Sequence, residues 1–369
     1  MPEPPPALTL APANHADLPG WTADDLSAAL PALARSCARI AARPDAQPVG
    51  PDGLAGTAAD WKPACAAAAA VPAGDRAAAR AVLERHFRPW RAGNNGKVEG
   101  LFTGYYEPLL EGSRGRGERY ATPLLKRPPD LVEVDLGSFR DGLKGQRIAG
   151  RVEGGRLRPY PSRAEIEDGA LAGRGLELFW VTDPIDAFVL QIQGSGRIRL
   201  PDGATVRVGY AGQNGHAYVA IGRLLIDRGE MAREAVTMPA IREWLAARPE
   251  AGRALMRENP SYVFFRELQG EGPLGAEGTA LTAGRSLAVD PKFLGYGIPL
   301  WLDVEDPLDP ALRVRRLMVA QDTGGAIRGP VRGDVFWGFG PEAAERAGRM
   351  KSRGGYWLLL PAGVTPKTG

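Results

Sequence analysis

The sequence predicts a mainly β protein with peripheral α-helices, divided into two domains. The chain has 369 residues, which is too long for one ordinary hydrophobic core. Its 48 glycines and 33 prolines favour turn-rich β structure over long helices. Beyond residue 98, most apolar segments are short and bounded by turn residues, which is typical of strands.

Composition excludes several classes of function. The 46 basic and 43 acidic residues give a net charge of +3, and this near balance argues against a nucleic-acid-binding protein. The isoelectric point of about 8.9 gives a mild preference for acidic partners, such as a carboxylate-bearing polymer. The three histidines are far apart and no HExxH or cysteine cluster occurs, so we expect neither a metal site nor a cofactor.

The N-terminal part predicts helices. Residues 1–20 are rich in Pro and Ala and suggest an extended lead-in. Helical spacing of apolar residues follows in 24–40, with Asp24 or Thr22 as the cap, and further helices are expected at 61–70 and 73–87. Cys37 and Cys65 lie in these helices, either as a disulfide or as two buried thiols.

The middle of the chain predicts a second β domain. Asp202-Gly203 is a strong hairpin signal between two of its strands. We expect a helix that starts near Pro159 and two amphipathic helices at 218–228 and 238–247. The predicted strands are 98–110, 120–125, 176–181, 186–196, 197–200, 205–210 and 259–265, with a basic glycine-rich loop at 112–117 and strand and turn fragments over 128–175.

The C-terminal part returns to strands, at 286–289, 299–304, 315–321, 334–337 and 356–360, with a short helix at 342–349. This order fits a β-barrel that an inserted β domain interrupts. We expect residues 21–104 and 266–369 in the first domain and 105–265 in the second.

Three aspartates in the C-terminal part are candidates for catalysis. Asp290 and Asp322 each end a short apolar run, while Asp334 follows a glycine and begins one. Low dielectric at the ends of buried strands raises a carboxyl pKa, which suits a general acid. The alternative is that all three are turn residues that cap strands.

Residues 191–196 are candidates for ligand binding. If 186–196 is a strand, Gln191 and Gln193 face the same side and can bind sugar hydroxyl or N-acetyl groups. Gly194 would let a ligand approach the backbone. The alternative is a hairpin bend with glutamines in solvent. Ser195 is the next residue, but no catalytic triad is readable around it, so a serine hydrolase is not favoured.

Two further segments contain residue types that occur in ligand-binding sites. Thr103, Tyr105, Tyr106 and Glu107 combine aromatic faces with a carboxylate, which suits a carbohydrate, although a strand that buries one tyrosine explains them equally well. The segment Thr323-Gly324-Gly325 has no following Lys-Ser/Thr, so it does not predict nucleotide binding.

Taken together, the ordered motifs over residues 95–360 resemble the membrane-bound lytic murein transglycosylase A (MltA) family. Any one of these motifs alone would be weak evidence for the resemblance. The matching segments are Gly104-Tyr-Tyr-Glu-Pro108, Phe188-Val-Leu-Gln-Ile-Gln-Gly-Ser-Gly196, Gly209-Tyr-Ala-Gly-Gln-Asn-Gly215, Asn259-Pro-Ser-Tyr-Val-Phe-Phe265 and the C-terminal module with the three aspartates, the 3D domain.

The resemblance implies a double-psi β-barrel, an inserted smaller β domain and a groove for a glycan strand. It places the single catalytic residue, acting as acid and base, at Asp334, and a supporting aspartate at Asp322. The residues expected to contact substrate are Thr103, Tyr105, Tyr106, Glu107, Gln191, Gln193, Gly194, Ser195, Gly324 and Asp290.

The implied reaction is that of a polysaccharide lyase. It breaks the β-1,4 bond between N-acetylmuramic acid and N-acetylglucosamine without water and forms a 1,6-anhydro product. Because the attacking 6-hydroxyl belongs to the substrate, its effective concentration can reach ~10⁵ M, and one acid suffices. Two alternatives are a non-catalytic peptidoglycan-binding module and an aspartic hydrolase, although only one Asp-Thr-Gly sequence occurs.

The resemblance also implies a place in the cell wall. We expect a monomer in the periplasm or at the outer membrane, which binds peptidoglycan and also cell-wall synthesis or division proteins, but no nucleic acid. The first residues, Met-Pro-Glu-Pro-Pro-Pro, contain neither a signal peptide nor a lipobox, so membrane anchoring stays open.

Overall fold

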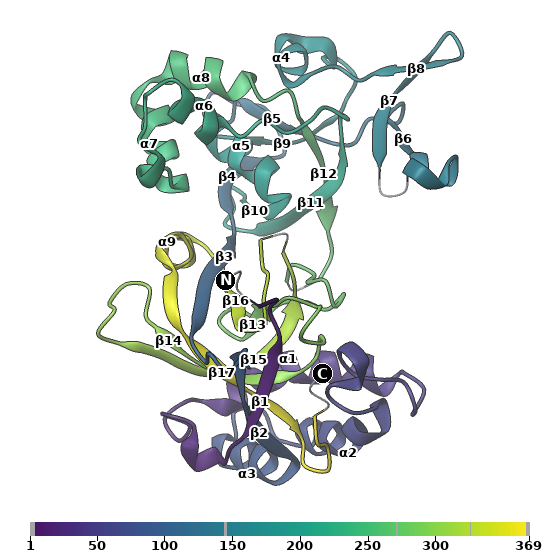
Figure 1. The fold of residues 1–369 in the computed structure, drawn as a ribbon. Coiled ribbons are helices and arrows are strands. Elements are labelled where there is room, and N and C mark those ends of the chain that lie inside the picture. The colour runs from purple at the N-terminus through teal and green to yellow at the C-terminus, as the bar shows by residue number, and fades with distance from the viewer. Residues whose placement is uncertain (1–3, 144–145, 271, 325, 367–369) are drawn as a thin grey trace. The chain divides into compact units, whose positions relative to one another are not determined.

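The computed structural model describes residues 4–143, 146–270, 272–324 and 326–366, which divide into two compact units (Figure 1). Unit 1 combines both ends of the chain, Met1–Tyr106 and Gly270–Gly369, and unit 2 is the continuous segment Glu107–Gln269. Each unit has hydrophobic clusters of its own, and no cluster among the described residues mixes the two. The predicted mainly β class, with a barrel and a second β unit, is confirmed.

Unit 1 contains a closed barrel of six strands. The barrel order is β17-β14-β15-β13-β16-β3, and β3 pairs back with β17 to close the ring. Strands β2 and β1 extend the sheet from β17. The strands are β1 (Leu8–Pro12), β2 (Phe87–Asn94), β3 (Gly100–Glu107), β13 (Ser286–Ala288), β14 (Pro299–Glu305), β15 (Arg313–Asp322), β16 (Arg332–Phe339) and β17 (Lys351–Pro361).

Close backbone approach explains two barrel glycines. A Cβ atom at Gly100 would lie 1.8 Å from the carbonyl oxygen of Val331, and one at Gly354 would lie 2.2 Å from that of Asp303. Gly354 also has a φ of 156°, near the edge of the range that side chains avoid. Glycine at both positions therefore lets β3 and β17 approach their neighbours closely where the barrel closes.

The helices of unit 1 are α1 (Leu30–Ala41), α2 (Ala58–Ala69), α3 (Arg76–His86) and α9 (Pro341–Arg349), close to the predicted ranges. Helices α1, α2 and α3 contact barrel or sheet strands β15, β17 and β2, respectively. Part of the lead-in is also structured, because Leu8–Pro12 pairs with β2. Cys37 and Cys65 form a disulfide between α1 and α2, which settles the open alternative.

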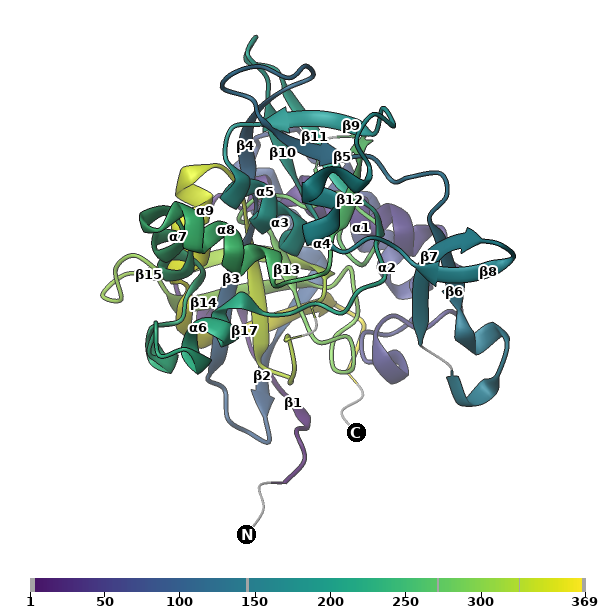
Figure 2. The same cartoon turned by 90° about the horizontal axis from the view of Figure 1, so that it is seen from above.

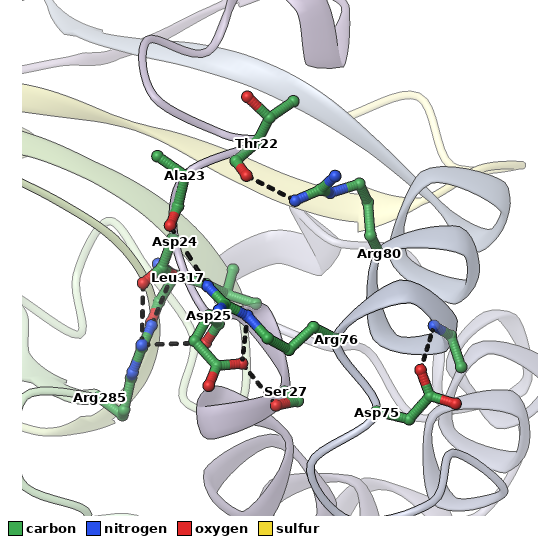
Figure 3. Close-up of polar contacts among 11 residues, drawn as sticks. Thr22, Ala23, Asp24, Asp25, Ser27, Asp75, Arg76, Arg80, Arg285 and Leu317 are labelled. Carbon is green, nitrogen blue, oxygen red and sulfur yellow. Dashed lines mark hydrogen bonds and ion pairs between the residues drawn. The ribbon is translucent and has the colours of Figure 1, made fainter.

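Asp24 has a different role from the predicted helix cap. No side-chain cap bond starts the helical segment, which begins as a 3₁₀ turn at Leu26–Ala29. Instead, the Asp24 carboxylate accepts hydrogen bonds from both terminal nitrogens of Arg285, at 2.6 and 2.9 Å, and from the backbone N–H of Leu317 at 3.0 Å (Figure 3). Thr22 does not cap it either; its carbonyl oxygen accepts from Arg80. These contacts fasten the N-terminal segment to β15.

Unit 2 contains a six-stranded sheet, β12-β11-β10-β4-β9-β5, and a three-stranded sheet, β6-β7-β8. Both views show the smaller sheet at one edge of the unit, away from α6 and α7 (Figures 1 and 2). The elements are β4 (Leu109–Ser113), β5 (Thr122–Leu125), β6 (Val132–Asp135), β7 (Arg147–Glu153), β8 (Arg156–Pro159), α4 (Arg163–Glu165), β9 (Glu177–Val181), α5 (Pro184–Gln193), β10 (Ser195–Arg199), β11 (Thr205–Gln213), α6 (Ile221–Asp227), α7 (Met238–Ala247), α8 (Pro249–Arg257) and β12 (Val263–Leu268).

The prediction of a strand over 186–196 is wrong, because Pro184–Gln193 is a helix. Asp183 caps its N-terminus by accepting from the N–H of Ile185, Pro184 occupies its first turn, and Gly194 ends it in the left-handed region at φ 78°. Helix α8 was not predicted. The hairpin at Asp202-Gly203 is confirmed, since β10 and β11 pair antiparallel.

Candidate active site

Asp334 lies on β16 of unit 1 and shares a small polar cluster with β3. Its Oδ1 accepts a hydrogen bond of 2.6 Å from the hydroxyl of Thr103. The Arg332 side chain donates to the same Thr103 oxygen at 2.9 Å. Arg332 and Asp334 are two residues apart on one strand, so their side chains point to the same face. Thr103 thus links the guanidinium to the carboxyl.

The surroundings of Asp334 favour its protonated form. Burial raises the pKa of Asp334 above its ordinary value, and the nearby Asp322 carboxylate raises it further. The Thr103 hydrogen bond and the Arg332 charge lower the pKa but do not reverse the shift. A carboxyl whose pKa is raised by burial can hold a proton for transfer, so the geometry suits a general acid.

Asp322 ends β15 in a contrasting environment of three donors. Its Oδ2 accepts from the hydroxyl of Tyr105 at 2.8 Å, and its Oδ1 accepts from the backbone N–H groups of Ala276 and Thr323 at 2.8 and 2.9 Å. Burial and the Asp322 charge hold the pKa of Tyr105 well above its usual value, so the phenol stays a donor. The structure therefore brings Thr103, Tyr105, Asp322 and Asp334 together in unit 1.

The buried side chain of Gln321, the residue before Asp322, forms a hydrogen-bond network with α1 and Ser286. Gln321 Nε2 donates to the carbonyl oxygen of Ala32 at 3.0 Å and to the Ser36 hydroxyl at 2.9 Å, and its Oε1 accepts from Ser286 at 2.6 Å. The carbonyl oxygen of Gln321 accepts from the N–H of Glu277, which follows the Ala276 donor in the chain. Interior packing of α1 thus fixes the position of Asp322.

Asp290 and Gly324 support loops. Asp290 is 2% exposed, and its two oxygens accept the backbone N–H groups of Gly329 and Lys292 at 2.8 and 3.1 Å. This burial argues against the predicted substrate contact. Gly324 accepts from the N–H of Ile327 in a turn. Gly325, the last residue of the Thr323-Gly324-Gly325 segment, lies outside the described residues.

In unit 2, the buried side chains of Glu107 and Gln191 each interact with arginine side chains of the same unit. The Glu107 carboxylate pairs with Arg197 at 2.7 Å and with Arg207 at 3.4 Å, and its side chain is 1% exposed. Gln191 accepts from buried Arg163 at 2.6 Å. Both arrangements are internal supports of the unit, in contrast to the predicted contacts with a sugar.

Gln193 is exposed at the end of α5. Because it follows Gln191 by two residues on a helix, the two amides point to different faces, and the expected pair on one side does not form. Gly194 is the left-handed cap, and Ser195 begins β10 opposite Gly209. Tyr106 is half-buried at the end of β3.

Sequence reasoning missed Arg332 and the Gln321 network. The alternation Arg332-Gly-Asp334 on a strand would have revealed the first, because residues two apart share a face. The second joins segments that are 285 residues apart, so no local signal exists for it. Within the described residues, no group of three or more His, Cys, Asp or Glu side chains could hold a metal.

Two family models match the chain, the MltA specific insert domain at residues 101–266 and the 3D domain at residues 285–360. Membrane-bound lytic murein transglycosylase A of Escherichia coli K12 is 37% identical over 279 residues, covering 73% of this chain and 68% of that protein. The crystal structure of MltA from Neisseria gonorrhoeae aligns with a TM-score of 0.83 at 34% identity, covering 98% and 93% of the two chains. E. coli MltA with bound chitohexaose aligns with a TM-score of 0.63 at 29% identity, covering 97% and 95%.

Proposed function

The chain belongs to the MltA family of lytic murein transglycosylases, and we propose that Asp334 is its catalytic acid and base. The protein is a lytic transglycosylase of peptidoglycan. The proposed reaction cleaves the β-1,4 bond between N-acetylmuramic acid and N-acetylglucosamine without water and leaves 1,6-anhydromuramyl ends. The observation that carries the role of Asp334 is its position on β16, half-buried and hydrogen-bonded to the Thr103 hydroxyl at 2.6 Å, where burial and the Asp322 carboxylate raise its pKa.

In the proposed mechanism, Asp334 takes part in both proton transfers. Protonated Asp334 donates its proton to the oxygen of the breaking glycosidic bond. The resulting carboxylate then accepts the proton of the 6-hydroxyl of muramic acid as that oxygen attacks C1. The acid is restored at the end of the cycle, and no water enters the product.

Asp322 supports the acid electrostatically. Its charge raises the pKa of Asp334, and its three donors hold it in place. Two carboxyl groups in unlike surroundings can take different roles at one pH. A second nucleophilic carboxylate is not needed, because the intramolecular hydroxyl has an effective concentration of ~10⁵ M or more when well placed.

Product analysis of murein sacculi tests this proposal. Asp334→Asn should lower the release of anhydro-muropeptides by about 10²- to 10⁴-fold, the usual contribution of a general acid, while the fold persists. Asp322→Asn should retain measurable activity, and Asp309→Asn, a turn aspartate of the same unit, is the matched control. Near-normal activity of Asp334→Asn together with loss in Asp322→Asn would transfer the role to Asp322. Reducing ends would indicate a hydrolase, and no products would indicate a binding module.

The glycan strand is the proposed ligand, with support from the relative that binds chitohexaose. We also propose an exported location, in the periplasm or at the outer membrane. The Cys37–Cys65 disulfide supports this, since such bonds persist in oxidising compartments, and the relatives are described as membrane-bound. None of the helices that the structure describes is long and apolar enough to cross a membrane.

A further inference from the structure

Unit 2 contains a polar cavity that the proposed reaction does not use. Its volume is ≈ 260 Å³, and its charged lining consists of Arg163, Arg253, Arg257 and Glu167. Phe188 and Met256 contribute to an apolar wall. A cavity that places several guanidinium groups beside apolar side chains suits a ligand that carries both a carboxylate and a hydrocarbon portion.

Arg163 forms the rigid cationic floor of this cavity. It is 3% exposed, its Nε donates to the carbonyl oxygen of Asn259 at 3.0 Å, and its Nη2 donates to Gln191 and to the carbonyl oxygen of Ser261 at 2.6 and 2.7 Å. The guanidinium group of Arg163 also lies over the ring of Phe188, with its central carbon 4.7 Å from the ring centre. The remaining nitrogen, Nη1, faces Glu167 at 3.6 Å, beyond good hydrogen-bond distance.

The other charges leave a cationic surplus. Arg257 binds Asp168 at 2.6 Å and stands 3.9 Å from Glu167. Arg253 is exposed, and among the residues that the structure describes it has neither a hydrogen bond nor an ion pair, although its charge acts on Glu167. Three arginines therefore face two carboxylates, and the long distances to Glu167 leave guanidinium N–H groups available to another acceptor.

We propose that this cavity binds the free carboxylate of a short peptide, with Arg253 and Arg163 as the anion partners and the apolar wall against the peptide side chains. Identifying that peptide as the peptide stem of murein rests on the proposed function; the carboxylate chemistry does not. Glu167 competes with the ligand for the same guanidinium groups and so weakens binding.

Calorimetric titration of the full chain tests the proposal with two probes, N-acetyl-alanyl-alanine and its C-terminal amide, which differ in the carboxylate. The acid should bind at least about tenfold more tightly than the amide, since hydrogen bonds between charged groups are the stronger kind. Arg253→Ala should weaken binding of the acid by about tenfold, and Glu167→Gln should strengthen it. Arg233→Ala removes an exposed arginine elsewhere in unit 2 and should change nothing.

Several results would overturn the proposal. These are equal affinity for acid and amide, no detectable binding of the acid, or unchanged binding in Arg253→Ala. Arg253 is exposed, so its loss should not affect folding, and Arg253→Lys should restore part of the affinity. Competition with sodium acetate distinguishes a peptide ligand from a small free carboxylate. If acetate displaces the peptide at equal concentration, the cavity binds small free carboxylates and the peptide assignment is wrong.

A murein assay separates this proposal from the proposed function. Arg253→Ala should slow anhydro-product release from sacculi with peptide stems and leave the rate on stem-free glycan strands unchanged. Equal rates on both substrates would remove the stem as the ligand. If the wild-type protein released no anhydro ends from either substrate, the proposed function would fail, while the titration result would stand independently.

Discussion

Burial of the Asp334 carboxyl couples stability to pH. Because burial raises its pKa, the folded protein keeps this proton to a higher pH than the unfolded chain does. The stability that protonated Asp334 contributes is therefore fully present below the pKa that this carboxyl has in the unfolded chain. The free energy of unfolding falls as pH rises through the higher pKa that it has in the folded protein. Asp334→Asn removes the ionisation, so we expect a higher melting temperature than wild type at neutral pH and a smaller difference near pH ~3. Scanning calorimetry across this range measures it, and a lower melting temperature at every pH would contradict it.

Thr103 should tune the pH dependence of activity. Its hydrogen bond lowers the pKa of Asp334, so the isosteric change Thr103→Val should move that pKa upward. An acid with a higher pKa stays protonated to a higher pH, and the alkaline limb of kcat/KM should shift in the same direction. The measurement is a pH profile of anhydro-product release, with the exposed Thr205→Val as control. A limb that stays fixed or moves to lower pH would show that Asp334 is not the titrating acid.

At the scale of elements, local patterns predicted a strand at the position of each of the six barrel strands but missed β2 and the helix α5. Val189, Leu190 and Ile192 are typical strand residues, and this composition suggested a strand. The apolar positions Ile185, Phe188 and Ile192 have helical spacing, and the Asp183 cap with Gly194 at the other end completes a helix signal. Because a strand was predicted in place of this helix, Gln191 and Gln193 were expected to share one face. Burial of Glu107 depends on Arg197 and Arg207, which are about a hundred residues away and carry no local signal.

The disulfide should matter for stability and not for chemistry. It joins α1 to α2 across a separation of 28 residues, and its sulfur atoms take no part in the contacts by which Ala32 and Ser36 of α1 hold Gln321, the residue before Asp322. The double change Cys37→Ala with Cys65→Ala should lower the free energy of unfolding by about 2–4 kcal/mol, because the unfolded chain loses a crosslink. Denaturant titration gives this value, and reductant should reproduce it in the wild-type protein. A comparable drop in the initial rate of the folded variant would instead mean that α1 needs the crosslink to hold Gln321 and Asp322 in place.

At the scale of the whole molecule, the two units have separate cores. The clusters of unit 2 use residues from Leu110 to Phe265, whereas the cluster of unit 1 draws on both ends of the chain. The described hydrogen bonds of Glu107 and Arg163 also stay within unit 2.

We therefore expect a fragment of residues 107–269 to fold alone, because a continuous segment with its own buried clusters satisfies the usual definition of a domain. It should unfold in one cooperative thermal transition, followed by circular dichroism, and release no anhydro-muropeptides, since Asp334 lies in unit 1. The complementary chain, with 107–269 replaced by a short linker, tests the same idea from the other side. A broad, non-cooperative melt of the fragment would show that residues 107–269 do not form an independent folding unit.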